Sequence, residues 1–270
     1  MSTKFGFMTG AFLGLSSIGA NATVADGVKL LEQGKIEESV KTLQAAYDAG
    51  DADGAFYIGR LFEMGIGTDR DLRRAAALYA AAAGKKSAKA QNRLGLMFLN
   101  GEVVLQDYER AGQLICAAAA AGDTNGQFNC GLLHAEGKGF AKEPAAALPF
   151  WEAAAKQNNV AAINYLGQAY LKGDGVAPDS AKAVSLFRRT AEAGNPMGLL
   201  ELAKALAGGR GMAADPMMAY AFANLAAARG HAEAPALRDS IGAKLSADEI
   251  AKAQAFARDW KAVPIEKTGL

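Results

Sequence analysis

The side chains with the strongest intrinsic chemistry in this chain are two cysteines, Cys116 and Cys130, and two histidines, His134 and His231. A zinc site needs several Cys, His, Asp or Glu ligands at short spacing, and no such cluster occurs in the sequence. The chain also contains neither an S-x-x-K sequence nor a G-x-S-x-G nucleophile elbow. We therefore predict no metal, no cofactor and no catalytic residue, and we interpret His134 as filling an aromatic position in a repeat.

The elements that would position any functional residue follow from a fixed spacing of glycines. They recur every 36 residues, at Gly65, Gly101, Gly137, Gly173 and Gly209. This interval is typical of solenoids of stacked helical repeats. Six residues before each of them stands a small residue, which we call the helix glycine position: Gly59, Gly95, Gly131, Gly167 and Ala203. Small residues on a helix face allow a neighbouring helix to approach closely, so this face is predicted to be packed.

A second helix is predicted after each glycine-rich turn. The turn holds a G-x-G sequence, and an acid follows it: Asp71, Asp107, Glu143, Asp179 or Asp215. Glycine tolerates positive φ, and an acid favours the beginning of a helix. Phosphate-binding G-x-G loops join a strand to a helix, whereas these join two helices, so we interpret them as structural.

The segment from Ala162 to Gly194 shows the repeat most clearly, with the pattern A-x-x-x-L-G-x-x-Y-x-x-G-x-G-V-x-x-D-x-x-K-A. This pattern resembles the Sel1-like repeat, a relative of the tetratricopeptide repeat with a longer turn. The resemblance implies an all-α fold, a right-handed α-α superhelix (solenoid) of helix-turn-helix repeats, with five repeats of 36 residues over residues 54–230. Val103 departs from the pattern, because it stands where the other repeats have the second turn glycine.

Both ends of the repeat array are predicted to be capped. Residues 23–53 resemble a tetratricopeptide hairpin, and residues 231–262 are expected to form C-terminal capping helices. The last of these begins with a capping box at Ser246 and Glu249 and runs to about residue 260. Residues 263–270 are expected to be a frayed tail.

The first 22 residues differ in kind from the rest of the chain. Lys4 precedes an apolar stretch, and Ala20-Asn21-Ala22 has the small residues of an A-x-A cleavage site. We interpret residues 1–22 as a signal peptide, which predicts a periplasmic or secreted protein. A leader that is not cleaved, in a cytoplasmic protein, is the alternative. With 29 basic and 28 acidic residues the chain is nearly neutral, which disfavours a nucleic-acid partner. No segment of the sequence predicts membrane insertion of the mature chain.

The two cysteines have two possible states. They lie seven residues either side of position 123, the expected turn between two antiparallel helices, and bridges join the same two helices in cysteine-rich members of the family that this chain resembles. An exported chain would permit such a bridge. Cys130, however, occupies a core position of the repeat and Cys116 does not. Two unpaired thiols that pack as small hydrophobic side chains are therefore the alternative.

Resemblance to tetratricopeptide grooves implies where a ligand would bind. The candidates lie three residues before and one after each helix glycine position: Phe56, Asn92, Phe128, Asn164 and Leu200, and Arg60, Leu96, Leu132, Gln168 and Lys204. Asparagine can bond an extended backbone, and phenylalanine offers apolar contact. If Asn92 and Asn164 face such a groove, replacing both by alanine should weaken binding without affecting stability. Each of these residues could alternatively serve only in packing.

The resemblance favours a non-enzymatic scaffold or adaptor that binds a protein or an extended peptide. Such a scaffold in the periplasm would regulate an envelope sensor or a secretion process. An envelope-acting hydrolase is a competing class, and a cytosolic assembly adaptor is a third if the leader is retained. A groove would favour the scaffold, whereas paired carboxylates or a Ser/His/Asp set in a closed cleft would favour the hydrolase.

Overall fold

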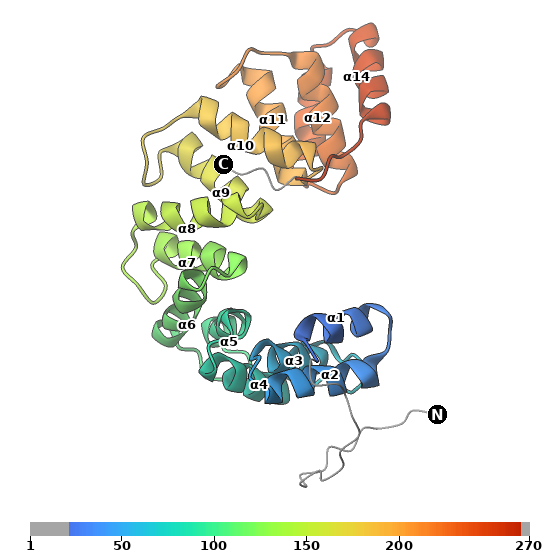
Figure 1. The fold of residues 1–270 in the computed structure, drawn as a ribbon. Coiled ribbons are helices and arrows are strands. Elements are labelled where there is room, and N and C mark those ends of the chain that lie inside the picture. The colour runs from blue at the N-terminus through green and yellow to red at the C-terminus, as the bar shows by residue number, and fades with distance from the viewer. Residues whose placement is uncertain (1–21, 266–270) are drawn as a thin grey trace. The chain divides into compact units, whose positions relative to one another are not determined.

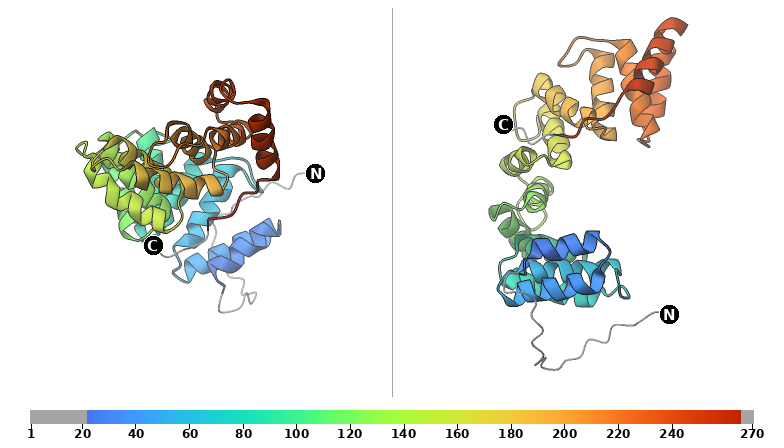
Figure 2. Two further views of the ribbon diagram at one scale, coloured as in Figure 1. Left: turned by 90° about the horizontal axis from the view of Figure 1, so that it is seen from above. Right: turned by 45° about the vertical axis from the view of Figure 1, so that its right-hand side comes forward.

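The computed structural model describes residues 22–265 and consists there of helices and their connecting turns (Figure 1). The expected signal peptide therefore lies outside the described residues, apart from Ala22. None of the described helices is long and apolar enough to cross a membrane. The described helices follow one another in chain order, and most consecutive helices within each unit pack against each other, which confirms the all-α superhelix class (Figures 1 and 2).

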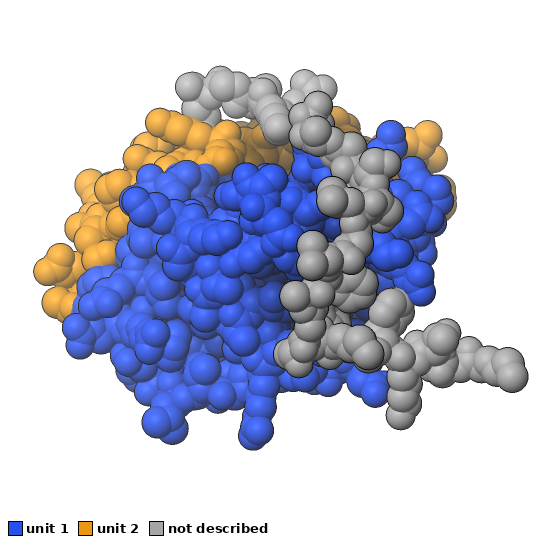
Figure 3. Space-filling view, turned by 60° about the horizontal axis from the view of Figure 1, so that its bottom comes forward, with its two compact units in different colours: residues 1–130, 138–140 blue, residues 131–137, 141–270 orange. Residues whose placement is uncertain are grey.

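The chain divides into two compact units (Figure 3). The first unit consists of residues 1–130 and 138–140, and the second of residues 131–137 and 141–270. The helices up to the boundary are α1 (Val24–Glu32), α2 (Ile36–Asp48), α3 (Asp53–Met64), α4 (Leu72–Gly84), α5 (Ala88–Asn100), α6 (Tyr108–Ala120) and α7 (Thr124–Glu136), which spans it. The second unit continues with α8 (Pro144–Lys156), α9 (Val160–Lys172), α10 (Ser180–Glu192), α11 (Pro196–Gly208), α12 (Pro216–Ala228), α13 (Ala234–Gly242) and α14 (Ala247–Asp259).

The turns inside the repeats form as their residues predict, except that Glu143 makes no side-chain cap bond at the beginning of α8. Gly173 ends α9 in the left-handed conformation, with φ of 79°. The backbone N–H of Asp179 then donates to the carbonyl of Tyr170 at 2.8 Å, which closes the turn, and the Asp179 carboxylate accepts from the N–H of Lys182 at 2.9 Å, which caps α10. The same aspartate cap begins α4, α6 and α12. The positive φ and the acid therefore act together, since one ends the first helix and the other begins the second.

The second glycine of the turn allows one repeat to contact the one before it. Gly175 has φ of 75°, and a Cβ built there would overlap backbone atoms of Pro144 and Ala145, at the beginning of α8. Gly211 meets the beginning of α10 in the same way. In the second repeat Val103 takes this position with φ of 55°, a conformation that β-branched residues rarely adopt. Its turn is nevertheless closed by the same bond, from the N–H of Asp107 to the carbonyl of Phe98 at 3.0 Å.

The C-terminal end is held more firmly than its sequence suggests. The capping box is present, and α14 ends at Asp259. Beyond it the guanidinium of Arg229 lies 4.8 Å from the Trp260 ring, and the N–H of Val263 donates to the Glu192 carbonyl at 2.8 Å. Val263 is therefore bonded to α10, and Trp260 contacts the residue that follows α12. Residues 266–270 of the expected frayed tail lie outside the described residues.

Candidate functional site

A groove of about 820 Å³ in the second unit contains three of the predicted ligand residues, Gln168, Leu200 and Lys204. Gln168 comes from α9 and the other two from α11, so two successive repeats contribute to the lining. A volume of this order is enough for several side chains of a bound segment. The first helices of these repeats thus line a hollow, as the resemblance implied.

On α9 and α11, most residues that line this groove follow one stripe along each helix. The stripe includes the residues two before and one after the helix glycine position. Tyr165, Gln168 and Lys172 form this stripe on α9, at spacings of three and four residues. Residues so spaced share one face of a helix. Tyr165 and Glu201, both two residues before a helix glycine position, are lining residues that our sequence reasoning missed. Both lie three residues before a predicted ligand residue, Gln168 or Lys204, and so on the same helix face. This spacing is the sequence signal that could have identified them.

The two asparagines that lie three residues before a helix glycine position are buried. Asn92 is 8% and Asn164 is 4% exposed. Leu200, at 1% exposure, contributes only the floor of the groove. A residue three before a buried glycine lies on the same helix face as that glycine and is packed with it. The burial of Asn92 and Asn164 therefore favours the alternative that these two candidates serve in packing.

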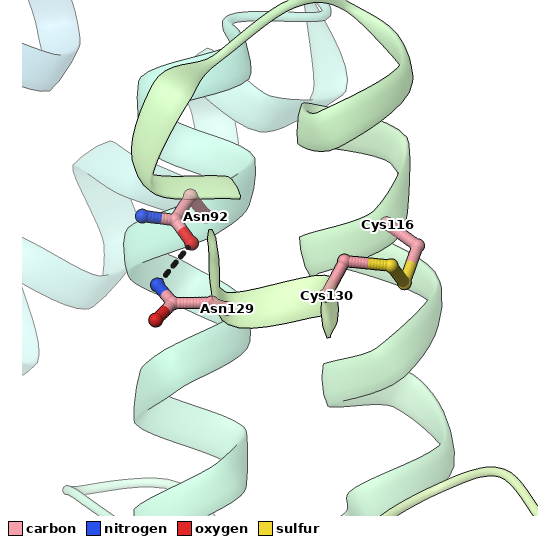
Figure 4. The surroundings of a disulfide bond; sticks show 4 residues. All are labelled: Asn92, Cys116, Asn129 and Cys130. Carbon is pink, nitrogen blue, oxygen red and sulfur yellow. Dashed lines mark hydrogen bonds between the residues drawn. A yellow bond between two sulfur atoms is a disulfide. The ribbon is translucent and has the colours of Figure 1, made fainter. Parts of the chain in front are cut away.

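The two buried asparagines bind other parts of the chain instead. The Asn129 side-chain amide donates to Asn92 Oδ1 at 2.9 Å, which links α5 to α7 (Figure 4). Asn164 Oδ1 accepts from the Thr190 hydroxyl at 2.7 Å, and its amide donates to Asn195 Oδ1 at 3.0 Å. Asn195 also caps α11, so Asn164 connects three successive helices.

Replacing Asn164 by alanine is accordingly expected to lower the free energy of unfolding by about 1–3 kcal/mol, because two buried bonds are lost, the one from the Thr190 hydroxyl and the one to Asn195 Oδ1. The Thr190 hydroxyl keeps only its longer bond, 3.1 Å, to the carbonyl of Phe187. Gln168→Ala, one helical turn later, removes a half-buried side chain with no such bond and serves as the control. Chemical denaturation followed by circular dichroism measures both. Equal midpoints for the two variants would contradict the structural role of Asn164.

Phe56, Arg60 and Phe128 lie in the first unit. The Phe56 ring centroid lies 5.2 Å from that of Tyr57 and 5.6 Å from that of Tyr79. Phe128 is half-buried on α7. Leu96 is likewise half-buried on α5, as is Leu132 on α7 in the second unit. None of these five residues lines the groove of the second unit.

Arg60 belongs to a charge network centred on Glu63. The Glu63 carboxylate accepts from Arg60 at 2.9 Å, from Arg93 at 2.8 Å and from the buried Tyr79 hydroxyl at 2.5 Å, and Arg93 also pairs with Glu102 at 2.8 Å. Although burial opposes ionisation, the bonds from Arg93 and Tyr79 hold the pKa of Glu63 below its usual value. Burial and the bond to Glu63 raise the pKa of Tyr79. This network joins α3, α4 and α5, so its charges are satisfied within the chain.

In the groove of the second unit, Lys204 lies between two carboxylates. Its Nζ is 3.0 Å from Glu201 and 3.1 Å from Glu233. Burial opposes the charge of Lys204, but the two hydrogen bonds raise its pKa above the usual value, and the bond from Lys204 lowers the pKa of Glu233. A general acid needs a carboxyl group that is protonated near neutral pH. Lys204 favours the ionised form of Glu233, which disfavours Glu233 as a general acid.

Cys116 and Cys130 form a disulfide in the structure (Figure 4). It joins α6 to α7, and therefore the second repeat to the third. Cys130 is fully buried, as its core position predicted, and Cys116 is half-buried beside it. The alternative of two free thiols does not describe this structure, because antiparallel helices bring the two positions to the same height.

The fold and the repeat turns define a solenoid of Sel1 repeats. The Sel1 repeat family model matches residues 52–86, 88–123, 124–159, 160–195 and 196–231, more than half of the chain. The chain therefore belongs to the Sel1 repeat family, whose fold is a protein-interaction scaffold. Comparison with curated proteins gives no significant match.

Solved structures of similar proteins agree with this assignment. A Sel1 repeat protein from Oxalobacter formigenes is 25% identical, with a TM-score of 0.75 over 91% of this chain and 100% of the other. A protective antigen of uropathogenic Escherichia coli strains with an SLR fold is 21% identical, with a TM-score of 0.59 over 89% of this chain and 61% of the other. The second similarity concerns the fold alone.

Proposed function

We propose that this protein is an exported, non-enzymatic scaffold that binds an extended segment of a partner protein in the groove of the second unit. The observation that carries the proposal is the groove itself, since stacked first helices line it with side chains of mixed character. Tyr165 is 41% exposed there, and its ring centroid lies 5.4 Å from that of Trp151. Exposed aromatic side chains supported by packed neighbours are frequent anchors of protein interfaces.

Two observations support export. The disulfide between Cys116 and Cys130 is a bond that persists in oxidising compartments such as the periplasm or the extracellular space. In addition, α1 begins at Val24 and is capped by Thr23, whose side chain and backbone bond Asp26. Cleavage after Ala22 would leave this cap intact. In the envelope, a scaffold that holds one component would regulate a sensor or a secretion process.

The export proposal predicts a mature protein that begins at Thr23. Ala20 and Ala22 supply the small residues that signal peptidase accommodates. Intact-mass measurement of protein purified from its native cells checks this result. A native protein that retains Met1 or Ser2 would instead support the cytosolic adaptor.

The groove is tested by site-specific crosslinking in native cells. A photo-crosslinking residue at Gln168, inside the groove, is expected to capture a partner protein. The same residue at Arg188, which is exposed on α10 and outside the groove, is expected not to capture it. Tyr165→Ala should reduce the capture, whereas Tyr108→Ala on α6 is the matched control because Tyr108 is 43% exposed. Equal capture from Gln168 and Arg188 would show that the groove is not the binding surface.

A further inference from the structure

The groove of the second unit carries an unbalanced set of charges. Its lining contains the cations Lys142, Lys172, Lys204 and Arg210 and the acids Asp174, Glu201 and Glu233. Lys204 forms ion pairs with both Glu201 and Glu233. Lys142, Lys172 and Arg210 are exposed and make no ion pair with any described residue, and Asp174 is the remaining acid of the lining. The groove thus presents three cations against one acid.

These cations belong to elements that the repeat places side by side. Lys172 is the last residue of α9, and Arg210 lies in the turn after α11, one repeat further along. Lys142 precedes α8, one repeat earlier. Three successive repeats therefore contribute one cation each to the same groove, next to the aromatic pair of Trp151 and Tyr165 and the apolar Met197 and Leu200.

We propose, on the basis of the function proposed above, that the bound partner segment is an acidic peptide that carries a large apolar side chain between its carboxylates. The apolar side chain lies against Tyr165 and Leu200, and the carboxylates pair with Lys172, Arg210 and Lys142. Opposite charges across an interface favour one class of partner, and like charges disfavour the other. A basic segment would bring its charges against these three cations.

Three synthetic peptides test the proposal. They share a central Phe-Leu pair and carry Glu, Gln or Lys at every flanking position. Fluorescence anisotropy with the full mature chain is expected to show that the Glu peptide binds at least tenfold more tightly than the Lys peptide. The difference should shrink at high ionic strength, because salt screens exposed charges. The Gln peptide should bind with intermediate affinity.

Charge reversal in the groove identifies the residues responsible. The double variant Lys172→Glu/Arg210→Glu is expected to lower affinity for the Glu peptide by about tenfold or more and to raise affinity for the Lys peptide. The control is Arg188→Glu on α10, an exposed charge reversal outside the groove. It should leave both affinities unchanged. Thermal unfolding of each variant establishes that the fold persists, and Lys172→Gln/Arg210→Gln replaces the double reversal if that variant is unstable.

The outcomes separate this proposal from the scaffold function. Equal binding of the three peptides, no binding of the Glu peptide, or an unchanged preference in the charge-reversed variant would overturn the acidic-partner proposal. The scaffold proposal would then stand if crosslinking from Gln168 still captures a partner. If crosslinking from the groove captures nothing, the scaffold function of this groove is itself wrong.

Discussion

Replacing Gly175 by valine is expected to lower the free energy of unfolding by about 3–5 kcal/mol, the largest effect of a single substitution that we predict. Two costs combine at this position. The backbone has φ of 75°, which a β-branched residue adopts only with strain, and the new Cβ would overlap backbone atoms of Pro144 and Ala145. Backbone atoms cannot rotate away as a flexible side chain can, so the contact between the third and fourth repeats must open.

Substitutions at two further glycines of the same unit distinguish the backbone strain from the steric overlap. Gly230 has φ of 82° but open space around it, so Gly230→Val should show only the backbone strain, about 1–3 kcal/mol. Gly208 has neither a positive φ nor a neighbour within reach, and Gly208→Val should have little effect. Chemical denaturation followed by circular dichroism gives the three values. Equal losses for Gly175→Val and Gly230→Val would show that the close contact between repeats contributes nothing.

Removing the disulfide is expected to lower the free energy of unfolding by about 3 kcal/mol, the value for a closed loop of roughly this length. Cys116 and Cys130 are separated by 14 positions, and the bond restricts the unfolded chain between them. The double variant Cys116→Ala/Cys130→Ala removes it without leaving a free thiol. Denaturant midpoints of this variant and of the parent protein measure the effect.

A reducing agent supplies the control for the disulfide. Reduction should lower the stability of the parent protein by a similar amount and leave the double variant unchanged. A thiol assay on the unreduced, unfolded parent should detect no free cysteine. Detection of two free thiols in protein from its native cells would contradict both the bridge and the oxidising compartment that we propose.

The repeat architecture could be predicted from the sequence because its causes are local. Gly173 ends a helix since it accepts a positive φ, and Asp179 begins the next one since its carboxylate accepts from a backbone N–H three residues later. Each such signal depends on a few neighbouring residues, and the interval of 36 residues repeats it along the chain. Secondary structure and repeat number therefore need no knowledge of distant contacts.

The candidate site could be predicted only in part. Of the predicted ligand residues, Gln168 and Lys204 line the groove, whereas Asn164 is buried. The resemblance that placed Asn164 at a ligand surface did not account for its position three residues before Gly167, which puts both on one packed face. A polar side chain suggested an exposed position, but the Asn164 amide is buried and forms hydrogen bonds with Thr190 and Asn195.

By itself, the sequence determined the helices, their turns and their caps, because hydrogen bonds within a few residues decide them. Tertiary structure alone decided that Cys116 and Cys130 meet, that Asn164 is buried and that the groove cations gather. Lys142, Lys172 and Arg210 are 30 or more residues apart in the chain. Only the stacking of one repeat on the next brings them to one groove, because glycines such as Gly175 and Gly211 allow the repeats to pack so closely.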